Sequence, residues 1–148
     1  MPDQSTIQRA RRDAREGKSP STQAGEFVRD EIRKVRRGQH GVRSPKQAIA
    51  IALSEARRAG VNLPPPKGRA SPAVRKRAQS DLKKGAQRKK PSPKRARAAL
   101  KALKKEPWST VSKSALSRQT RAAARRRSAA DRSRAAKKAA QTRHRKAA

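Results

Sequence analysis

Large apolar side chains are too few in this chain to build an ordinary core, and this shortage constrains the fold most. The 148 residues include only two aromatic side chains, Phe27 and Trp108, and much of the 32% hydrophobic fraction is alanine. Burying a large side chain contributes about 1.5–3 kcal/mol, whereas ordering the backbone costs about 1–2 kcal/mol per residue. Low hydrophobicity with high net charge is typical of disorder. We therefore expect a mostly α chain with extensive disorder, in which a small αα-hairpin head is followed by a flexible basic tail of short helices.

The charge of the chain indicates the class of partner. Lys and Arg number 43 against 10 Asp and Glu, which gives a formal net charge of +33. Self-repulsion opposes compaction, and a polyanionic partner relieves it. Protein surfaces that serve only solubility usually mix positive and negative charges. DNA is the partner that we expect, in duplex form, with RNA as the alternative and an anionic membrane surface as a weaker one.

Composition also excludes several kinds of site and location. The chain has no cysteine, which excludes disulfides, thiolate catalysis and cysteine zinc sites. Residues 1–13 lack the apolar stretch of a signal peptide. The longest apolar run, residues 48–53, is about a third of a membrane span. We expect no membrane insertion and a cytoplasmic location.

The charge is divided unevenly at the run Pro64-Pro65-Pro66, which should form a stiff extended spacer. Residues 1–66 hold 14 basic and 7 acidic side chains, whereas residues 67–148 hold 29 basic and 3 acidic ones. This division predicts four parts: a flexible N-terminal segment with room for one short helix over 1–23, the hairpin head over 24–63, a Pro-rich linker over 64–70 and the basic nucleic-acid-binding tail over 71–148.

Two helices are expected in the head. Apolar side chains at steps of four, four and three predict a helix over residues 24–37, which Gly38 ends. Ser44 suits an N-cap and Pro45 suits the first helical position, so they predict the start of a second helix, which Gly60 ends. The short glycine-containing loop between the two helices favours an αα-hairpin.

The tail repeats the same pair of residues at its helix starts. Ser71-Pro72 and Ser92-Pro93 predict helices over 72–84, before a glycine, and over 93–106, before a proline. The Ala/Arg/Lys-rich stretch 112–146 favours helix by propensity but lacks a continuous apolar stripe. We expect this last stretch to be frayed alone and to become helical when phosphates neutralise its arginines.

The basic clusters of the tail are the candidate binding residues. Each cation placed on a phosphate releases condensed counterions, and that release drives binding without sequence preference. Such contacts position the protein on the duplex without reading bases. We predict that the phosphate contacts are made by Arg75, Lys76, Arg77, Lys83, Lys84, Arg88, Lys89, Lys90, Lys94, Arg95, Arg97, Lys101, Lys104, Lys105, Arg118, Arg121, Arg125, Arg126, Arg127, Arg132, Arg134, Lys137, Lys138, Arg143, Arg145 and Lys146.

Two local features of the tail have more than one interpretation. The stretch Ser92-Pro93-Lys94-Arg95 resembles the Ser-Pro-basic-basic element of linker-histone tails, which is associated with A·T-rich minor grooves. A plain helix N-cap is the favoured interpretation, and residues 88–97 also match a nuclear localisation patch. Trp108 is predicted to pack locally, with stacking on a base or wedging into a base step as the alternative.

No catalytic or metal-binding set is present in the sequence. His40 and His144 are too isolated to form a metal site or a catalytic base. The carboxylates Asp30, Glu31 and Glu55 are best explained by surface salt bridges with neighbouring arginines. The chain has neither a phosphate-cradling glycine-rich loop nor a nucleophile elbow. We therefore predict that the protein is not an enzyme and needs no cofactor.

Part of the chain resembles a known family. Residues 26–60, with the run Lys-Gln-Ala-Ile-Ala-Ile-Ala-Leu-Ser-Glu-Ala at 46–56, look like a small bacterial domain of unknown function found in short basic proteins, mostly of proteobacteria. The tail segments 114–119 and 122–125 resemble the tails of those proteins. Members tend to be labelled histone-like, DNA-binding or plasmid-stabilisation proteins. The resemblance implies a bacterial source and agrees with the charge argument, but it implies no mechanism and no site residues.

These observations predict a function and leave two alternatives. We expect a histone-like accessory protein of a bacterial nucleoid or plasmid, which binds DNA without sequence preference by neutralising phosphates. The first alternative is an RNA- or ribosome-associated basic protein, because nothing in the sequence distinguishes the 2′-hydroxyl. The second is a plasmid-stabilisation protein whose head, residues 24–63, binds a protein partner.

Overall fold

The computed structural model describes residues 2–68, 70–87 and 92–147, with the backbone alone at 145–147. The described residues form seven α-helices and one short 3-10 helix, without a β-strand. The mostly α prediction is therefore confirmed. The chain divides into two compact units, Met1–Ser112 and Lys113–Ala148, which we call unit 1 and unit 2. In the described part of the chain, no helix is both long enough and apolar enough to cross a membrane.

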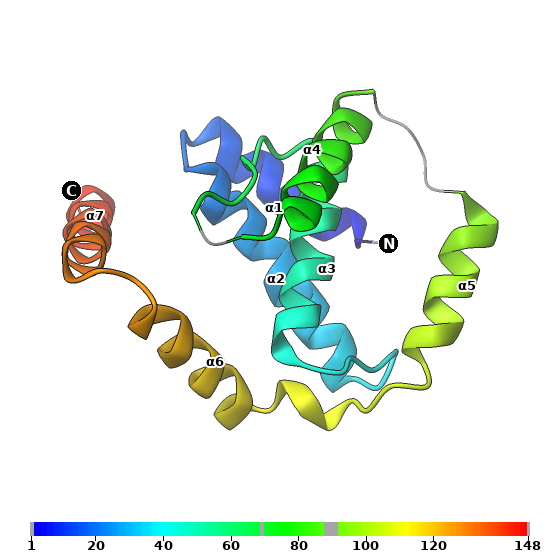
Figure 1. Ribbon diagram of the computed structural model, residues 1–148. Coiled ribbons are helices and arrows are strands. Elements are labelled where there is room, and N and C mark those ends of the chain that lie inside the picture. The colour runs from blue at the N-terminus through cyan, green and yellow to red at the C-terminus, as the bar shows by residue number, and fades with distance from the viewer. Residues whose placement is uncertain (1, 69, 88–91, 148) are drawn as a thin grey trace. The chain divides into compact units, whose positions relative to one another are not determined.

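Unit 1 is built around a hairpin of two helices. Helices α2 and α3 lie side by side, with α1 packed on α2 and α4 packed on α3 (Figure 1). Helix α5 and the 3-10 helix η1 follow in the chain, and unit 2 contains α6 and α7. The helices are α1 (Gln4–Arg15), α2 (Pro20–Arg36), α3 (Pro45–Arg58), α4 (Pro72–Ala86), α5 (Pro93–Leu103), η1 (Ser109–Val111), α6 (Lys113–Arg125) and α7 (Ala129–Ala147).

Serine-proline pairs begin four of the helices. The hydroxyl of Ser44 accepts a hydrogen bond from the Gln47 amide at 3.3 Å, which confirms the predicted start of α3. Ser71 caps α4 in the same way, and α5 begins at the predicted proline without a side-chain cap bond from its serine. The same device at Ser19-Pro20 begins α2 four residues before the predicted start at 24. Because proline fixes φ and lacks the amide hydrogen, it suits this first position.

Several predicted helix ends differ from the structure. Helix α4 runs through Gly85 to Ala86, and α5 ends at Leu103 rather than at 106. The final stretch forms two helices, because Ser128 interrupts it and its hydroxyl accepts from the Asp131 amide at 3.1 Å. A serine in this position starts a new helix by satisfying an amide that has no partner inside the helix.

Residues 2–23 are ordered, so the flexibility predicted for this segment is wrong, and the short helix for which the prediction left room is present as α1. Helix α1 packs on α2 and buries Thr6, Ala10 and Asp13. The guanidinium of Arg9 donates to the Glu26 carboxylate at 2.7 Å and so ties the two helices together. A buried face and an ion pair between helices order this segment.

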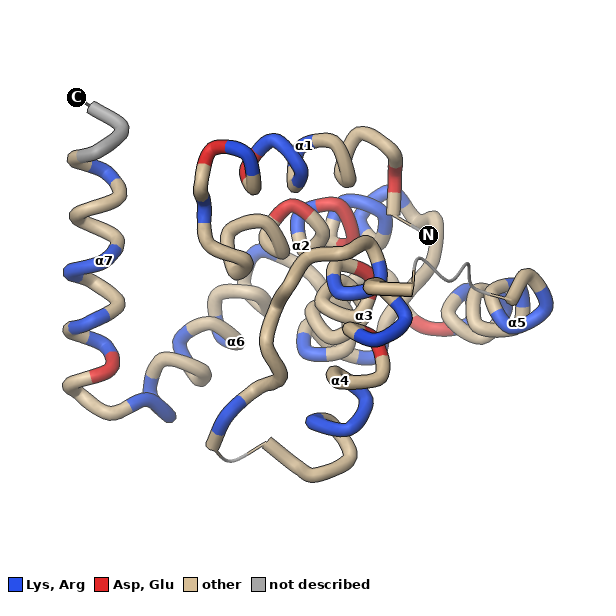
Figure 2. Tube along the Cα trace, turned by 90° about the horizontal axis from the view of Figure 1, so that it is seen from above, with Lys and Arg blue, Asp and Glu red and all other residues tan. Residues whose placement is uncertain are grey.

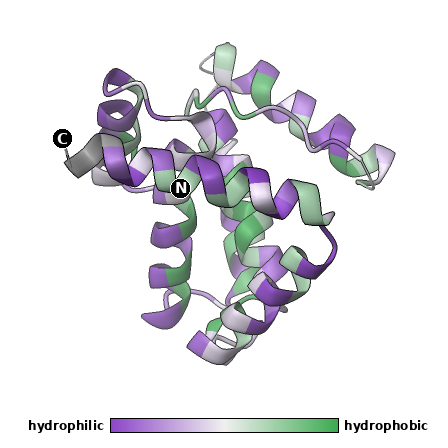
Figure 3. Ribbon diagram, turned by 90° about the vertical axis from the view of Figure 1, so that its left-hand side faces the viewer, coloured by the Kyte–Doolittle hydropathy of each residue, from purple (hydrophilic) through white to green (hydrophobic). Residues whose placement is uncertain are grey.

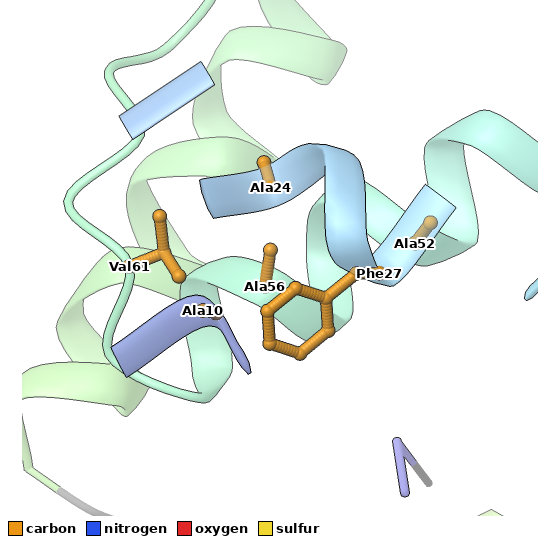
Figure 4. Close-up of a cluster of buried hydrophobic side chains, with 6 residues drawn as sticks. All are labelled: Ala10, Ala24, Phe27, Ala52, Ala56 and Val61. Carbon is orange, nitrogen blue, oxygen red and sulfur yellow. The ribbon is translucent and has the colours of Figure 1, made fainter. Parts of the chain in front are cut away.

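The core of unit 1 is made largely of alanine. One cluster contains Ala10, Ala24, Phe27, Ala52, Ala56 and Val61, and the Phe27 ring points towards Ala56 (Figure 4). Coloured by hydropathy, the helices carry their hydrophobic residues interspersed with hydrophilic ones (Figure 3). Small side chains allow helix backbones to approach closely, and the interior is then filled with few large groups.

A second cluster joins the segment after α5 to the hairpin. Val35, Val42, Ala48 and Val111 are all fully buried in it. Backbone hydrogen bonds reinforce this contact, from the Gly41 amide to the Leu103 carbonyl and from the Val42 amide to the Pro107 carbonyl, both at 3.0 Å. The hydroxyl of Thr110 donates to the Val42 carbonyl at 2.6 Å. Residues 103–112, predicted in the tail, are therefore part of unit 1.

The prediction of extensive disorder is wrong, and the packed unit is larger than the predicted hairpin. The segment predicted as a linker, 64–70, lies within unit 1. The buried guanidinium of Arg57 donates to the carbonyls of Leu63 and Pro64 at 3.1 and 3.4 Å, which holds the start of this segment against α3. Alanine packing and buried polar hydrogen bonds therefore order more of the chain than its few large side chains predict.

The close approach of α4 to α3 requires glycine at position 85. A Cβ atom there would overlap the backbone carbonyl of Arg57, whereas a Cβ at Gly25, inside α2, would meet open space. We expect Gly85→Ala to lower the free energy of unfolding by about 2 kcal/mol through overpacking. The matched variant Gly25→Ala should raise it by about 1 kcal/mol, because alanine favours helix. Urea unfolding followed by circular dichroism measures both, and equal effects would contradict the close approach.

Candidate nucleic-acid interface

The predicted binding residues are exposed wherever the structure describes their side chains, from Arg75 to Arg143. Basic residues recur along α4, α5, α6 and α7 (Figure 2). Three of the predicted residues, Arg88, Lys89 and Lys90, lie outside the described residues, and so do the side chains of Arg145 and Lys146. The described cations are thus available to a partner in solution.

On α4, packing against α3 decides which way the cations face. Ala78, Asp81 and Gly85 are buried and recur at steps of three and four, so they form the face that contacts α3. The helical periodicity places the basic side chains on the remaining surface, and they are Arg75, Lys76, Arg77, Lys83 and Lys84, all exposed.

Helices α5 and α6 each carry one straight basic stripe. The cations of each stripe recur at positions i, i+3 and i+7, which lie on one face of a helix. Each stripe is roughly 10 Å long at 1.5 Å per residue, about three steps of the 3.4 Å rise of a DNA strand. The stripes are Lys94, Arg97 and Lys101 on α5 and Arg118, Arg121 and Arg125 on α6, all exposed.

Helix α7 has a different arrangement, because its cations lie on two opposite sides of the axis. By helical spacing Arg132 and Arg143 share one side, whereas Arg134, Lys137 and Lys138 share the other. Neither α6 nor α7 buries any of the side chains that the structure describes. A helix that is polar all round has no stripe with which to pack on a core.

The acidic side chains of residues 67–148 leave the basic charge there almost intact. Asp81 pairs with Arg58 at 2.7 Å and Glu106 pairs with Arg43 at 3.2 Å, so both neutralise arginines of the first 66 residues. Asp131 pairs with Arg134. Among the described residues after position 66, Arg134 is therefore the single cation in an ion pair.

Asp81 is the polar tie between α4 and α3. Its buried carboxylate accepts from the Ser54 hydroxyl at 2.6 Å and from the Arg58 guanidinium at 2.7 Å. Burial alone would raise the pKa of Asp81, but these two hydrogen bonds and the positive charge of Arg58 outweigh it and lower the pKa. The ionised form is therefore the one that holds α4 in place.

Asp30 and Glu31 are buried, which corrects their prediction as surface salt bridges with arginines, whereas Glu55 is half-buried. Asp30 pairs with Lys34 at 2.8 Å, and Glu31 lies 3.6 Å from the His40 ring. Burial raises the pKa of Glu31 despite His40, and its Oε1 atom has no hydrogen-bond partner among the described residues. In the described part of the chain, no group of three His, Asp or Glu side chains could hold a metal ion.

Trp108 does not pack into a core, which corrects its predicted local packing role. It is 63% exposed, more than Val74 and Leu100, the other large hydrophobic side chains exposed in the described part of the chain. It precedes η1 and follows Pro107, whose carbonyl is hydrogen-bonded to the hairpin loop.

The hairpin carries a basic row that the sequence argument missed. Arg29, Arg33 and Arg36 on α2 and its C-cap residue Arg37 are all exposed, away from the apolar face that buries Phe27. Arg29 also pairs with Glu26, and Arg36 donates to the Val111 carbonyl. Their spacing of i, i+4, i+7 and i+8 already predicts a basic row along one side of a helix. The row does not stand out in the charge totals, because residues 1–66 also hold 7 acidic side chains.

Comparison with known proteins adds one match. Residues 17–67 match a family of unknown function (DUF6496), and these residues comprise α2, α3 and the Pro-rich segment that Arg57 holds. No curated protein and no solved structure matches the chain. The matched segment includes residues 26–60, on which the resemblance to a small bacterial domain rests.

Proposed function

We propose that the protein binds duplex DNA without sequence preference, as a histone-like accessory protein of a bacterial nucleoid or plasmid. Its exposed lysines and arginines neutralise phosphates and release counterions, which supplies the free energy of binding. No base-reading contact is required for this, because backbone contacts fix position without reading sequence.

The proposal rests on how few of the cations after position 66 are paired with carboxylates. Of the three acidic residues after position 66, Asp81 and Glu106 pair with Arg58 and Arg43. Apart from Arg134, which pairs with Asp131, the described cations of α4 to α7 therefore face solvent without an ion-pair partner, in a chain of net charge +33. Such a surface is costly unless a polyanion covers it.

The arrangement of the cations also supports compaction. Unit 2 carries 13 lysines and arginines, and unit 1 carries the α2 row as well as the surfaces of α4 and α5. Two basic units in one chain can bind two duplex segments. Once one unit is bound to a duplex, the other unit is held near the DNA, which raises its effective concentration for a second segment. We infer that the protein bridges duplexes at high occupancy.

Binding to two unrelated DNA duplexes and to an RNA duplex of equal length tests the proposal. Fluorescence anisotropy at physiological salt should give affinities for the two DNA sequences within about threefold of each other, since the phosphate term ignores sequence. A clear preference for one DNA sequence would contradict non-specific binding. A clear preference for RNA would replace the proposal by the ribosome- or RNA-associated alternative.

A further inference from the structure

Trp108 is the feature of the molecule that phosphate neutralisation leaves unexplained. The chain has two aromatic side chains, and Phe27 is buried in the core. The indole of Trp108 is 63% exposed, and its N–H has no hydrogen-bond partner among the described residues. A large aromatic side chain is usually buried, and exposed aromatics are enriched where a partner binds.

The backbone on both sides of Trp108 is held firmly. The Pro107 carbonyl accepts from the Val42 amide at 3.0 Å. Thr110 donates to the Val42 carbonyl at 2.6 Å, and Val111 is fully buried. A Cβ atom on Gly41 would overlap the carbonyl of Glu106, so the hairpin loop and this segment are in direct backbone contact. The scaffold therefore holds the backbone that carries the indole in place, which lowers the entropy cost of ordering this segment when a partner binds.

A cavity of about 420 Å³ lies beside the indole. It is lined by the loop residues 38–41 together with Lys104, Glu106 and Trp108. Its volume falls within the range of small-ligand sites, roughly 300–1,000 Å³. The ammonium of Lys104 contributes positive charge, and the carboxylate of Glu106 is paired with Arg43 at 3.2 Å. The site thus offers an aromatic face, a cation and a hollow of ligand size.

We infer that Trp108 is a stacking site for an unpaired nucleobase, with the adjoining phosphates on Lys104 and Lys105. Every base has a π-face, so stacking of this kind needs no sequence preference. The cations of α5, which begin at Lys94, continue the basic surface along the chain and would follow the strand. This inference rests on the proposed function and adds to it a preference for single-stranded or unpaired regions over uniform duplex.

The fluorescence of Trp108 reports on this site directly, because it is the only tryptophan in the chain. The full chain is titrated with a thymidine oligonucleotide, with the matched uridine oligonucleotide and with inorganic polyphosphate of equal charge. All three neutralise lysine and arginine, but only the oligonucleotides can stack. We expect strong quenching by the oligonucleotides and little by polyphosphate. Equal quenching by free uridine monophosphate at the same concentrations would mean that the site binds free nucleotides and not a base within a strand. That result would overturn the inference.

Variants separate stacking from charge. Trp108→Ala should lower the ratio of oligonucleotide affinity to polyphosphate affinity about tenfold, the usual loss for one stacked base. Trp108→Phe should retain most of the ratio, because phenylalanine keeps an aromatic face. Val74→Ala removes another exposed hydrophobic side chain, 52% exposed on α4, and should leave the ratio unchanged. Circular dichroism verifies that each variant keeps its helix content.

Two outcomes would overturn the inference and are distinguishable from each other. If the oligonucleotides and polyphosphate all bind tightly and Trp108→Ala leaves the ratio of their affinities unchanged, the stacking site is refuted while the proposed function stands. If neither the oligonucleotides nor polyphosphate bind tightly to the unaltered chain, its cations do not neutralise phosphates, so the mechanism of the proposed function fails and the stacking site fails with it.

Discussion

A chain that ends at Ser112 is expected to bind duplex DNA roughly a thousandfold more weakly than the full chain at 0.2 M salt, since each lost phosphate contact removes about 0.9 from the log–log salt slope. Unit 2 carries 13 of the 43 lysines and arginines. If about half of them contact phosphates, the slope becomes shallower by about 6. All the buried residues of the described chain lie at or before Val111, so the truncated chain keeps its core. Anisotropy with labelled duplex measures both quantities.

Substitutions on α6 provide the matched control for charge. Replacing Arg118, Arg121 and Arg125 by glutamine should make the salt slope shallower by about 3, whereas replacing them by lysine should leave it nearly unchanged. The two triple variants differ in charge and not in helix propensity. A truncated chain that binds as tightly as the full chain would refute the role of unit 2.

The second large effect concerns stability. We expect Asp81→Asn to lower the free energy of unfolding by about 2–3 kcal/mol at neutral pH, because it removes a buried charge that accepts two hydrogen bonds. Glu16→Gln removes an exposed carboxylate that pairs with Lys18, and it should change stability little. Thermal unfolding followed at 222 nm compares the two variants.

The effect of Asp81→Asn should also depend on pH. The folded-state pKa of Asp81 lies below its ordinary value of 3.8. A carboxyl with a lowered pKa contributes stability that is complete above the unfolded value and is lost as the pH falls through the folded value. The difference between the unaltered chain and the variant should therefore be constant above about pH 5 and shrink below pH 4. A difference that grows on acidification would contradict the ionised tie between α4 and α3.

Local structure was predicted well from the sequence because its determinants lie within a few residues of each other. Ser44, Ser71 and Ser92, each followed by proline, begin helices where predicted. Gly38 and Gly60 follow the ends of α2 and α3 with positive φ angles of 70° and 97°. A left-handed residue at this place satisfies carbonyls at the helix end, and glycine adopts it without strain.

Packing was predicted poorly because its determinants are distant in the sequence and chemically modest. Arg58 and Asp81 are 23 residues apart, and nothing local indicates that they pair. Val111 joins a cluster with Val35 and Val42 across an intervening stretch of basic sequence. The core also uses alanine where the composition argument required larger side chains, so the size of unit 1 was underestimated.

In the candidate interface, too, local features were predicted from the sequence and contacts between distant residues were not. Exposure of the tail cations followed from composition, because an abundance of lysine and arginine cannot be buried. Their freedom from carboxylates did not follow, since it depends on Glu106 pairing with Arg43 and Asp81 pairing with Arg58. The exposure of Trp108 was missed for a related reason. Pro107 and Thr110, on either side of it, are hydrogen-bonded to Val42, far away in the sequence, while the Trp108 side chain is left outside.

The salt dependence of duplex DNA affinity tests phosphate neutralisation most directly. Anisotropy of a labelled random-sequence duplex is measured with the full chain at several concentrations of salt between 50 and 200 mM, the interval in which six to ten phosphate contacts lose about 10³–10⁵ in affinity. Phosphate neutralisation predicts a linear log–log plot with a slope steeper than about −6, because unit 2 alone contributes about that much and the cations of unit 1 add to it. A slope near zero, with affinity intact at high salt, would mean that binding does not depend on the exposed lysines and arginines and would contradict the account.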